Sequence, residues 1–139
     1  MEYDLCSTET TDSRVVVQEN RSRFEVKNSR RESLKKVQVD GCLINDHREK
    51  CDWIIEVNNQ SKRALYIELK GCDVDKAISQ LKSTLIHTRE RYTNYAKECF
   101  AVTTRIPKHG ASTRKKCLDF HKQTNVTLSI KNLNTSIAA

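Results

Sequence analysis

Residues 51–81 read CDWIIEVNNQSKRALYIELKGCDVDKAISQL, and this stretch predicts two strands followed by a helix. Residues 50–57 and 64–70 are short segments rich in apolar side chains, which is typical of strands, and successive side chains of a strand point to opposite faces. Residues 58–61, NNQS, are turn formers that separate the two strands. The two strands are therefore expected to pair as a hairpin.

Three polar side chains stand out at the ends of these strands. Glu68 and Lys70 are two residues apart, so they share one face of their strand, while Leu65, Ile67 and Leu69 form an apolar row on the other face. Asp52 lies near the start of the first strand. In an antiparallel hairpin, the start of one strand lies beside the end of the other. The sequence therefore predicts that two carboxylates and a lysine converge at one end of a sheet.

The flanking sequence predicts further helices and strands. In chain order these are a short helix from Arg30 to about Lys36, a strand over 36–44, a helix from Asp73 or Asp75 to about Ala96, a strand over 98–105, a helix from Ser112 or Thr113 to about Gln123, and a strand over 125–132. The first three strands are expected to form an antiparallel meander, whereas the strands that flank the long helix need a crossover and are expected to be parallel. The order predicts an α/β fold with a mixed central sheet flanked by helices.

Length and composition predict one folded domain with short tails. A chain of 139 residues is long enough to bury a core without staples. The domain is expected over residues 21–132. Residues 1–20 are expected to be a polar tail with at most a short strand over 14–18, and residues 133–139 a second tail.

The cysteines and the N-terminus predict a cytoplasmic protein. None of the six cysteines forms a Cys-x-x-Cys pair, and several lie at apolar positions of predicted strands, so they are expected to be reduced and to pack as small hydrophobes. The N-terminus lacks an apolar signal region, and no apolar run approaches the length of a membrane span. A contact with a membrane is therefore not expected.

The net charge of +7 favours a polyanionic partner, although ordinary solubility charge is the alternative. Basic residues crowd two regions, and these are the candidates for sequence-independent phosphate contacts. They are Arg30, Arg31, Lys35 and Lys36 in the first region and Lys108, Arg114, Lys115 and Lys116 in the second. For the second region, a solvated helix face remains an equal alternative.

Asp52, followed after a hairpin-length gap by Glu68-Leu69-Lys70, resembles the signature of the PD-(D/E)XK nuclease superfamily. Cys51 stands where that family often has a proline. With the flanking elements, the resemblance covers residues from about Ser29 to Lys131. It implies a restriction-endonuclease-like fold and a metal-dependent nuclease that acts on DNA rather than RNA, with Mg²⁺ or Mn²⁺ as its cofactor.

The resemblance also implies roles for individual residues. Asp52 and Glu68 become metal ligands, because Mg²⁺ prefers oxygen ligands and needs only one or two protein carboxylates. The main-chain carbonyl of Leu69 is a further ligand, and Lys70 orients or deprotonates the attacking water. Gln80, on the following helix, resembles a glutamine that some relatives carry near the scissile phosphate.

Several alternatives remain open at this point. Glu32 and Asp40 are rival candidates for an additional acidic ligand. Asp52 could instead cap a turn, while Glu68 and Lys70 could form a solvated strand face. The chain could then be a catalytically inactive nucleic-acid-binding module of the same fold, or a basic partner protein of a larger complex. Because no device for sequence recognition is visible, a homodimer or a partner protein is expected to supply specificity.

Overall fold

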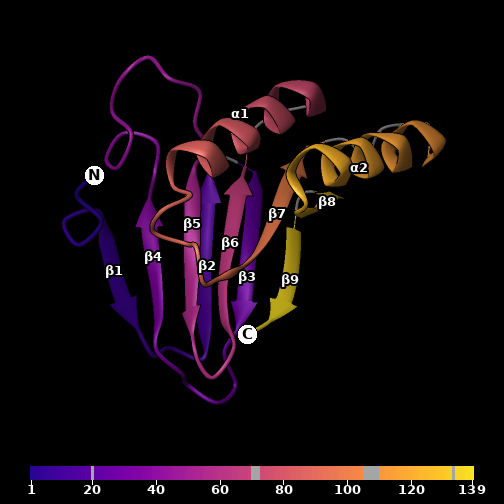
Figure 1. The fold of residues 1–139 in the computed structure, drawn as a ribbon. Helices are drawn as coiled ribbons and strands as arrows, with labels where there is room; N and C mark the ends of the chain where they lie inside the picture. The colour runs from indigo at the N-terminus through magenta and orange to yellow at the C-terminus, as the bar shows by residue number, and fades with distance from the viewer. Residues whose placement is uncertain (20, 70–72, 105–109, 133) are drawn as a thin grey trace.

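The computed structural model describes residues 1–19, 21–69, 73–104, 110–132 and 134–139, and for residues 110 and 111 it describes the backbone alone. Strands and helices alternate along the second half of the chain (Figure 1). The elements are β1 (Ser7–Thr10), β2 (Arg14–Glu19), β3 (Ser22–Lys27), β4 (Leu34–Gln38), β5 (Trp53–Asn58), β6 (Lys62–Glu68), α1 (Val74–His87), β7 (Ala96–Thr103), α2 (Gly110–Thr124), β8 (Thr127–Asn132) and β9 (Asn134–Ala138).

A mixed sheet of six strands forms the centre of the fold, in the order β1-β4-β5-β6-β7-β8. The strands β4, β5 and β6 form an antiparallel meander, as predicted. The pairs β6–β7 and β7–β8 are parallel, with α1 and α2 as their crossovers. The predictions of an α/β fold and a mixed sheet are thus confirmed.

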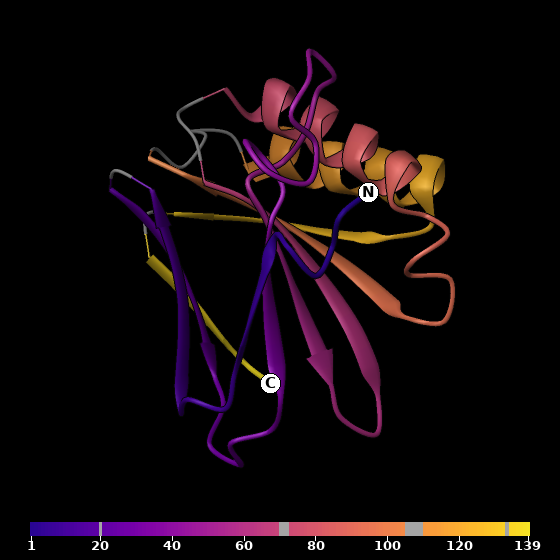
Figure 2. The same ribbon diagram turned by 90° about the vertical axis from the view of Figure 1, so that its left-hand side faces the viewer.

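The fold has three layers, because a second sheet covers the face of the central sheet that the helices leave open (Figure 2). This second sheet has the order β2-β3-β9. Alternate residues of β6 belong to different cores: Tyr66 packs in the cluster that includes the helices, and Leu65 and Ile67 pack against the small sheet. Since the central strands are buried on both faces, they read as nearly continuous apolar runs.

The long helix α1 is shorter than the sequence predicts. It begins after Asp73, whose side chain accepts a hydrogen bond from the backbone of Lys76 at 3.0 Å, as an N-cap residue does. It ends at His87, although apolar residues continue at helical spacing to Ala96. Thr88 donates its hydroxyl to the Thr84 carbonyl at 2.7 Å and also lies 2.6 Å from the Tyr66 hydroxyl. These side-chain contacts fix a turn where helix continuation was predicted.

Both predicted tails contain strands. The first 20 residues include β1, which is an edge strand of the central sheet and pairs with β4, and β2, which pairs with β3. At the other terminus, β9 runs parallel to β3, and Ile137 packs into the core between the sheets. The short strand allowed over 14–18 corresponds to β2, but the prediction of polar tails at 1–20 and 133–139 is otherwise wrong, because β1 and β9 pair with strands far away in the sequence.

The short helix predicted from Arg30 to Lys36 is absent from the described structure, which has a turn and then β4 there. The Asn28 side chain holds this turn: its oxygen accepts from the Glu32 N–H at 3.0 Å, and its amide donates to the Glu32 carbonyl at 2.8 Å. Leu34 and Val37 then pack into different cores, which requires a strand. Strand pairing therefore outweighs the capping pattern that predicted a helix.

Two cysteines predicted to be reduced form a disulfide, between Cys6 and Cys42. Pairing of β1 with β4 brings Cys6 beside the segment that follows β4, where the Gln38 N–H donates to the Cys6 carbonyl at 2.8 Å. The prediction of reduced thiols is therefore wrong for this pair. Cys51 and Cys99 are free and buried, and Cys117 is free and half-buried, while Cys72 lies outside the described residues. In the part of the chain that is described, no helix is long and apolar enough to cross a membrane.

Candidate functional site

Asp52 and Glu68, two of the predicted acidic residues, lie at one edge of the central sheet. The parallel strands β6, β7 and β8 all end at this edge, which is the upper one in Figure 1, and both helices begin there. Asp52 immediately precedes β5, and Glu68 is the last residue of β6. Because β5 and β6 are antiparallel, the start of β5 lies beside the end of β6. In an open α/β sheet, this is the edge where ligands usually bind.

Hydrogen bonds bring Asp52 against the end of β6. Trp53 pairs with Ile67 in the sheet register, and the Asp52 N–H donates to the Ile67 carbonyl at 3.1 Å. Oδ2 of Asp52 accepts a hydrogen bond from the Leu69 N–H at 2.8 Å. That N–H belongs to the peptide unit that joins Glu68 to Leu69. The Asp52 carboxylate therefore touches the backbone next to Glu68.

Asp52 and Glu68 form a buried acidic pair: Asp52 is 4% exposed and Glu68 is 1% exposed. Burial raises the pKa of the neighbouring Cys51 thiol well above its usual value, and the negative charges of Glu68 and Asp52 raise it further. Both acidic groups therefore act on one buried thiol. Because burying a charge is costly unless it is compensated, such a pair favours a cation nearby.

The structure describes Leu69, but not all of the other predicted site residues. Leu69 is buried, with its N–H held by Asp52. Lys70 and Lys108 lie outside the described residues, so their proposed roles stay predictions.

Gln80 is linked to the start of β5 through Thr84. The Thr84 hydroxyl accepts a hydrogen bond from the Cys51 N–H at 2.8 Å and donates to the Gln80 carbonyl at 2.9 Å. Residues four apart on a helix share a face, so Gln80 lies one turn nearer the start of α1 on the face that meets Cys51. The half-buried Gln80 is thus on the part of α1 that approaches the acidic pair.

The structure separates the two rival acidic residues. The N–H groups of Val39 and Asp40 both donate to the Asp52 carbonyl, at 3.0 and 3.4 Å, so two residues oppose one, as in a β-bulge. Bulges often re-aim side chains next to functional sites. Asp40 is therefore adjacent to Asp52 in the backbone and remains a candidate ligand.

Glu32 lies at the opposite end of the same strands. It precedes β4, where Leu34 pairs with Val57 and the Ser33 carbonyl accepts from the Asn58 N–H at 3.3 Å. Six residues of β5 separate this end from Asp52, which corresponds to roughly 20 Å. The prediction of Glu32 as a metal ligand beside Asp52 is therefore wrong.

The first basic region does not form a single patch. Arg30 and Arg31 are exposed in the turn before β4, at the end of the sheet remote from Asp52. Lys35 and Lys36 are neighbours in β4 and point to opposite faces: Lys35 lies 3.8 Å from an Asp4 carboxylate oxygen, and Lys36 lies 5.4 Å from the centre of the Trp53 ring. These four residues therefore do not form one surface with the acidic pair, and their contacts with phosphates stay a prediction.

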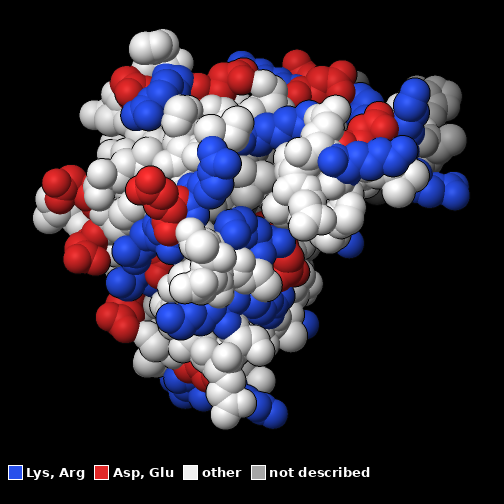
Figure 3. All heavy atoms as spheres, in the orientation of Figure 1, with Lys and Arg blue, Asp and Glu red and all other residues white. Residues whose placement is uncertain are grey.

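The second basic region begins at the same edge as the acidic pair. Arg114 and Lys115 are exposed in the first half of α2, and Figure 3 shows Lys and Arg side chains around this helix. Nζ of Lys116 donates to Oδ1 of Asp75, in the first turn of α1, at 2.7 Å. This ion pair links the starts of the two helices. Arg114 and Lys115 are therefore available for a polyanion that approaches this edge.

A buried acidic residue that sequence reasoning missed is Glu56 of β5, which is 1% exposed. It accepts hydrogen bonds from the Arg91 guanidinium at 3.1 Å and from the Tyr92 hydroxyl at 2.7 Å. The available signal was a lone carboxylate within an apolar strand. Because Glu56 is compensated by its own arginine, it is structural rather than part of the acidic pair.

The polar groups beneath the helices predict loss of stability at alkaline pH. Burial raises the pKa of Tyr66 and Tyr92 above the usual value, and Glu56 raises that of Tyr92 further. Burial also raises the pKa of Cys51 and Cys99. In each case the unfolded chain ionises first, so the stabilisation is complete below the unfolded pKa and is lost as the pH rises above it.

Urea unfolding should therefore show the free energy of unfolding falling from about pH 8.5, where unfolded thiols ionise, and more steeply above about pH 10, where unfolded tyrosines ionise. Tyr66→Phe should reduce the slope above pH 10 by up to about 1.4 kcal/mol per pH unit. A stability that is independent of pH in this range would contradict the burial of these groups.

The fold and the site together define an α/β protein with a mixed central sheet and a buried acidic pair where its parallel strands end. No protein-family model, curated protein or solved structure matches the chain. Among the described residues, no three His, Cys, Asp or Glu side chains gather as a ready-made metal cluster. A metal site at this edge would accordingly rest on the acidic pair, with main-chain oxygens or water.

Proposed function

We propose that the protein is a metal-dependent nuclease of the PD-(D/E)XK type, which hydrolyses phosphodiester bonds of DNA in preference to RNA. The observation that carries the proposal is the contact of the Asp52 carboxylate with the peptide unit that follows Glu68, at a buried strand end. An antiparallel meander, a crossover helix and a parallel strand surround this contact. That order supports a restriction-endonuclease-like fold.

The donor set fits Mg²⁺ or Mn²⁺. Both acidic groups offer hard oxygen atoms, and a carboxylate has roughly four lone-pair sites, so Asp52 can accept the Leu69 N–H and ligate a cation as well. When bound, the cation would polarise the phosphate and help to generate the attacking hydroxide. Asp52 and Glu68 would hold it, together with the carbonyl of Leu69. Asp40 is the candidate for a further oxygen ligand.

The other residues have supporting roles in this proposal. Lys70 either orients the attacking water as a cation or, when neutral, takes a proton from it, and the resulting positive charge offsets the negative charge that develops on the phosphate. Gln80 contacts the scissile phosphate or the water from α1. Arg114 and Lys115 hold the flanking phosphates. Specificity would come from a second copy of the chain or from a partner protein.

The test is incubation of the purified protein with supercoiled, linear and single-stranded DNA and with structured RNA. Each substrate is given Mg²⁺, Mn²⁺ or a chelator. Cleavage that needs the metal and favours DNA is the expected result. A folded protein that is inert toward every substrate with every metal would refute the nuclease.

The exposed residues Arg114 and Lys115 of α2 give a separate prediction about DNA binding. Arg114→Ala with Lys115→Ala should weaken DNA binding similarly for all sequences, because phosphate contacts carry no sequence information. The slope of log affinity against log salt should fall in magnitude by about 0.9 for each phosphate of duplex DNA that the variant no longer neutralises. Fluorescence anisotropy at several salt concentrations measures both effects.

Lys27→Ala with Lys62→Ala is the matched control, because it removes two exposed cations that lie away from α2. This variant should keep the slope of the wild type. Equal slopes for both double variants would mean that binding depends on overall charge and not on α2.

A nucleic-acid-binding module without catalysis is the second candidate. The hydrogen bond from the Leu69 N–H to Asp52 favours it, because that bond gives Asp52 a purely structural reason to be buried. DNA binding with the salt dependence given above, without cleavage, would identify this function. Failure to bind nucleic acid would instead favour a protein whose basic surface binds an acidic protein partner. Residence in the cytoplasm stays a prediction.

A further inference from the structure

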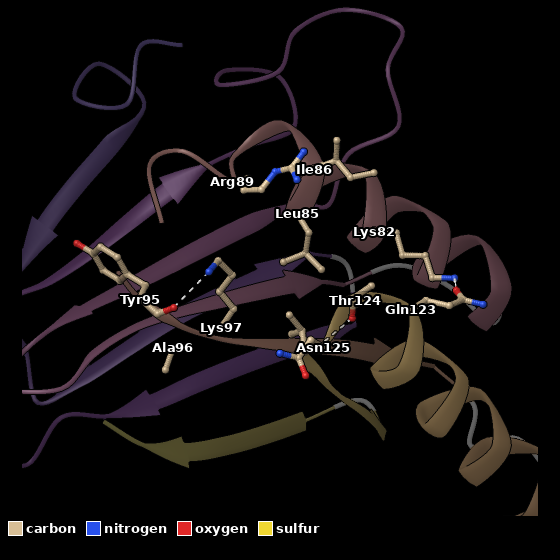
Figure 4. A pocket seen from close by; sticks show the side chains of 11 residues that line it. Lys82, Leu85, Ile86, Arg89, Tyr95, Ala96, Lys97, Gln123, Thr124 and Asn125 are labelled. Atoms are coloured by element: carbon tan, nitrogen blue, oxygen red, sulfur yellow. Dashed lines mark hydrogen bonds between the residues drawn. The ribbon is translucent and has the colours of Figure 1, made fainter. Parts of the chain in front are cut away.

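A groove of about 580 Å³ lies at the other end of the helices, away from the acidic pair (Figure 4). The last two turns of α1, the start of β7 and the end of α2 form its walls. Since β7 begins at this end, the groove lies at the sheet edge opposite the one where Asp52 and Glu68 are found. Its size is within the range of small-molecule sites, about 300–1,000 Å³.

The lining of the groove combines an apolar floor with three cations. Leu85 and Val126 are buried at its base, and Ile86 is 61% exposed at its rim. Lys82, Arg89 and Lys97 bring the positive charge, and none of the lining residues described is acidic. The groove therefore matches a ligand that has an apolar body and a negative charge.

The nearest acidic residue of β7 points away from this groove. Lys97 and Glu98 are consecutive in the strand and so face opposite sides of the sheet. Glu98 pairs with Arg63 at 2.9 Å, whereas Lys97 lies on the helix side, where Nζ donates to the Tyr95 carbonyl at 3.3 Å. The positive charge of Lys97 is thus not cancelled by its neighbour.

The three cations differ in how they are engaged. Nζ of Lys82 donates to the Gln123 side chain and lies 5.9 Å from the centre of the Phe120 ring, so Lys82 closes one end of the groove. Among the described residues, none accepts a hydrogen bond from the guanidinium of Arg89. Part of the positive charge offsets the negative ends of the two helices, which finish at His87 and Thr124. The three full positive charges exceed the negative charge of roughly one unit that the C-terminal ends of the two helices present together.

We propose that this groove binds a small phosphorylated molecule with a flat apolar body, of the nucleoside monophosphate class. Arg89 and Lys97 would hold the phosphate, since charge-assisted hydrogen bonds to guanidinium and ammonium groups are the strong ones. The apolar body would lie over Leu85 and Val126. This site is distinct from the proposed nuclease site, and it neither needs a metal nor depends on cleavage.

The test is calorimetric titration of the whole protein with adenosine monophosphate in the presence of a chelator, which prevents phosphate binding through a cation at the acidic pair. Saturable binding is expected. Adenosine, which lacks the phosphate, and inorganic phosphate, which lacks the apolar body, should each bind at least about tenfold more weakly. No saturation at millimolar adenosine monophosphate, or phosphate binding as tight as that of the nucleotide, would overturn the proposal.

Three variants locate the binding. Arg89→Ala with Lys97→Ala should weaken binding of the nucleotide by about tenfold or more, and Ile86→Trp should weaken it by obstructing the rim of the groove without changing its charge. Lys76→Ala with Lys27→Ala is the control, because it removes two exposed cations that do not line the groove. Thermal melting confirms that each variant is folded. Equal weakening in the control, or full affinity in Ile86→Trp, would show that the nucleotide does not occupy this groove.

Discussion

Glu68→Ala is expected to abolish metal-dependent cleavage and to weaken metal binding at the same time. The site has few protein ligands, so the loss of one carboxylate removes a large part of its affinity for the cation. Cleavage should fall by roughly 10²-fold to 10⁴-fold or more, the range typical for loss of a group that acts on the reacting atoms. Plasmid cleavage and manganese titration by calorimetry on the same sample measure the two effects.

Lys70→Ala is expected to abolish cleavage while metal binding survives or strengthens slightly. The variant removes the group that positions the water but leaves both carboxylates, and it removes a positive charge that opposes a cation. The two variants thus differ in metal affinity although both lack activity. This difference separates the role of a ligand from that of a water-activating group.

Glu90→Ala is the matched control for Glu68→Ala, because it removes an exposed carboxylate just after α1. It should retain the activity and the metal affinity of the wild type. Thermal melting of all three variants shows whether the fold is intact. Full activity in both Glu68→Ala and Lys70→Ala would refute the assignment of the acidic pair as a nuclease site.

Arg91→Ala is expected to destabilise the protein by about 3 kcal/mol, without any direct effect on the acidic pair. Arg91 is the cation that compensates Glu56, whose side chain is 1% exposed. Loss of one partner of a buried ion pair leaves an uncompensated buried charge, which costs about 3–5 kcal/mol. We expect the lower end because the Arg91 side chain is itself 31% exposed. The guanidinium also lies 4.4 Å from the centre of the Tyr3 ring, so the N-terminus should loosen as well.

Urea denaturation of Arg91→Ala and of Glu56→Gln with Arg91→Ala distinguishes the buried charge from a loss of packing. The double variant should recover part of the stability, because a neutral amide is cheaper to bury than a carboxylate. Arg48→Ala serves as the control, since Arg48 pairs with the exposed Asp46 and surface pairs contribute little. No recovery in the double variant would mean that Arg91 acts through packing alone.

Local pattern was sufficient to predict the centre of the fold. The apolar segments at 50–57 and 64–70, the turn at 58–61 and the apolar stripe after Asp73 correspond to β5, β6 and α1. These signals are local because burial on a strand or a helix face repeats with the period of that element. The antiparallel meander and the parallel crossover then followed from the lengths of the connections.

The same local reasoning located part of the candidate site. Asp52 and Glu68 were predicted to lie at one strand end from the hairpin alone, and the contact at Leu69 is at that end. Glu32 and the basic residues 30–36 were misjudged because the predicted helix there is a turn and a strand. Residues that are close in sequence there lie on different faces and at different ends of the sheet.

Sequence by itself thus determined the elements whose partners are adjacent in the chain and the acidic pair that they carry. Tertiary structure alone decided the addition of β9 to the second sheet, the pairing of β1 with β4 and the disulfide between Cys6 and Cys42. It also decided that Glu56 is compensated by Arg91 and that a cationic groove lies at the far end of the helices. The physical reason is that these features join segments far apart in the chain. Their stability comes from a shared buried surface and from charges that folding brings together. Such contacts leave no periodic pattern in the sequence of the segments that make them.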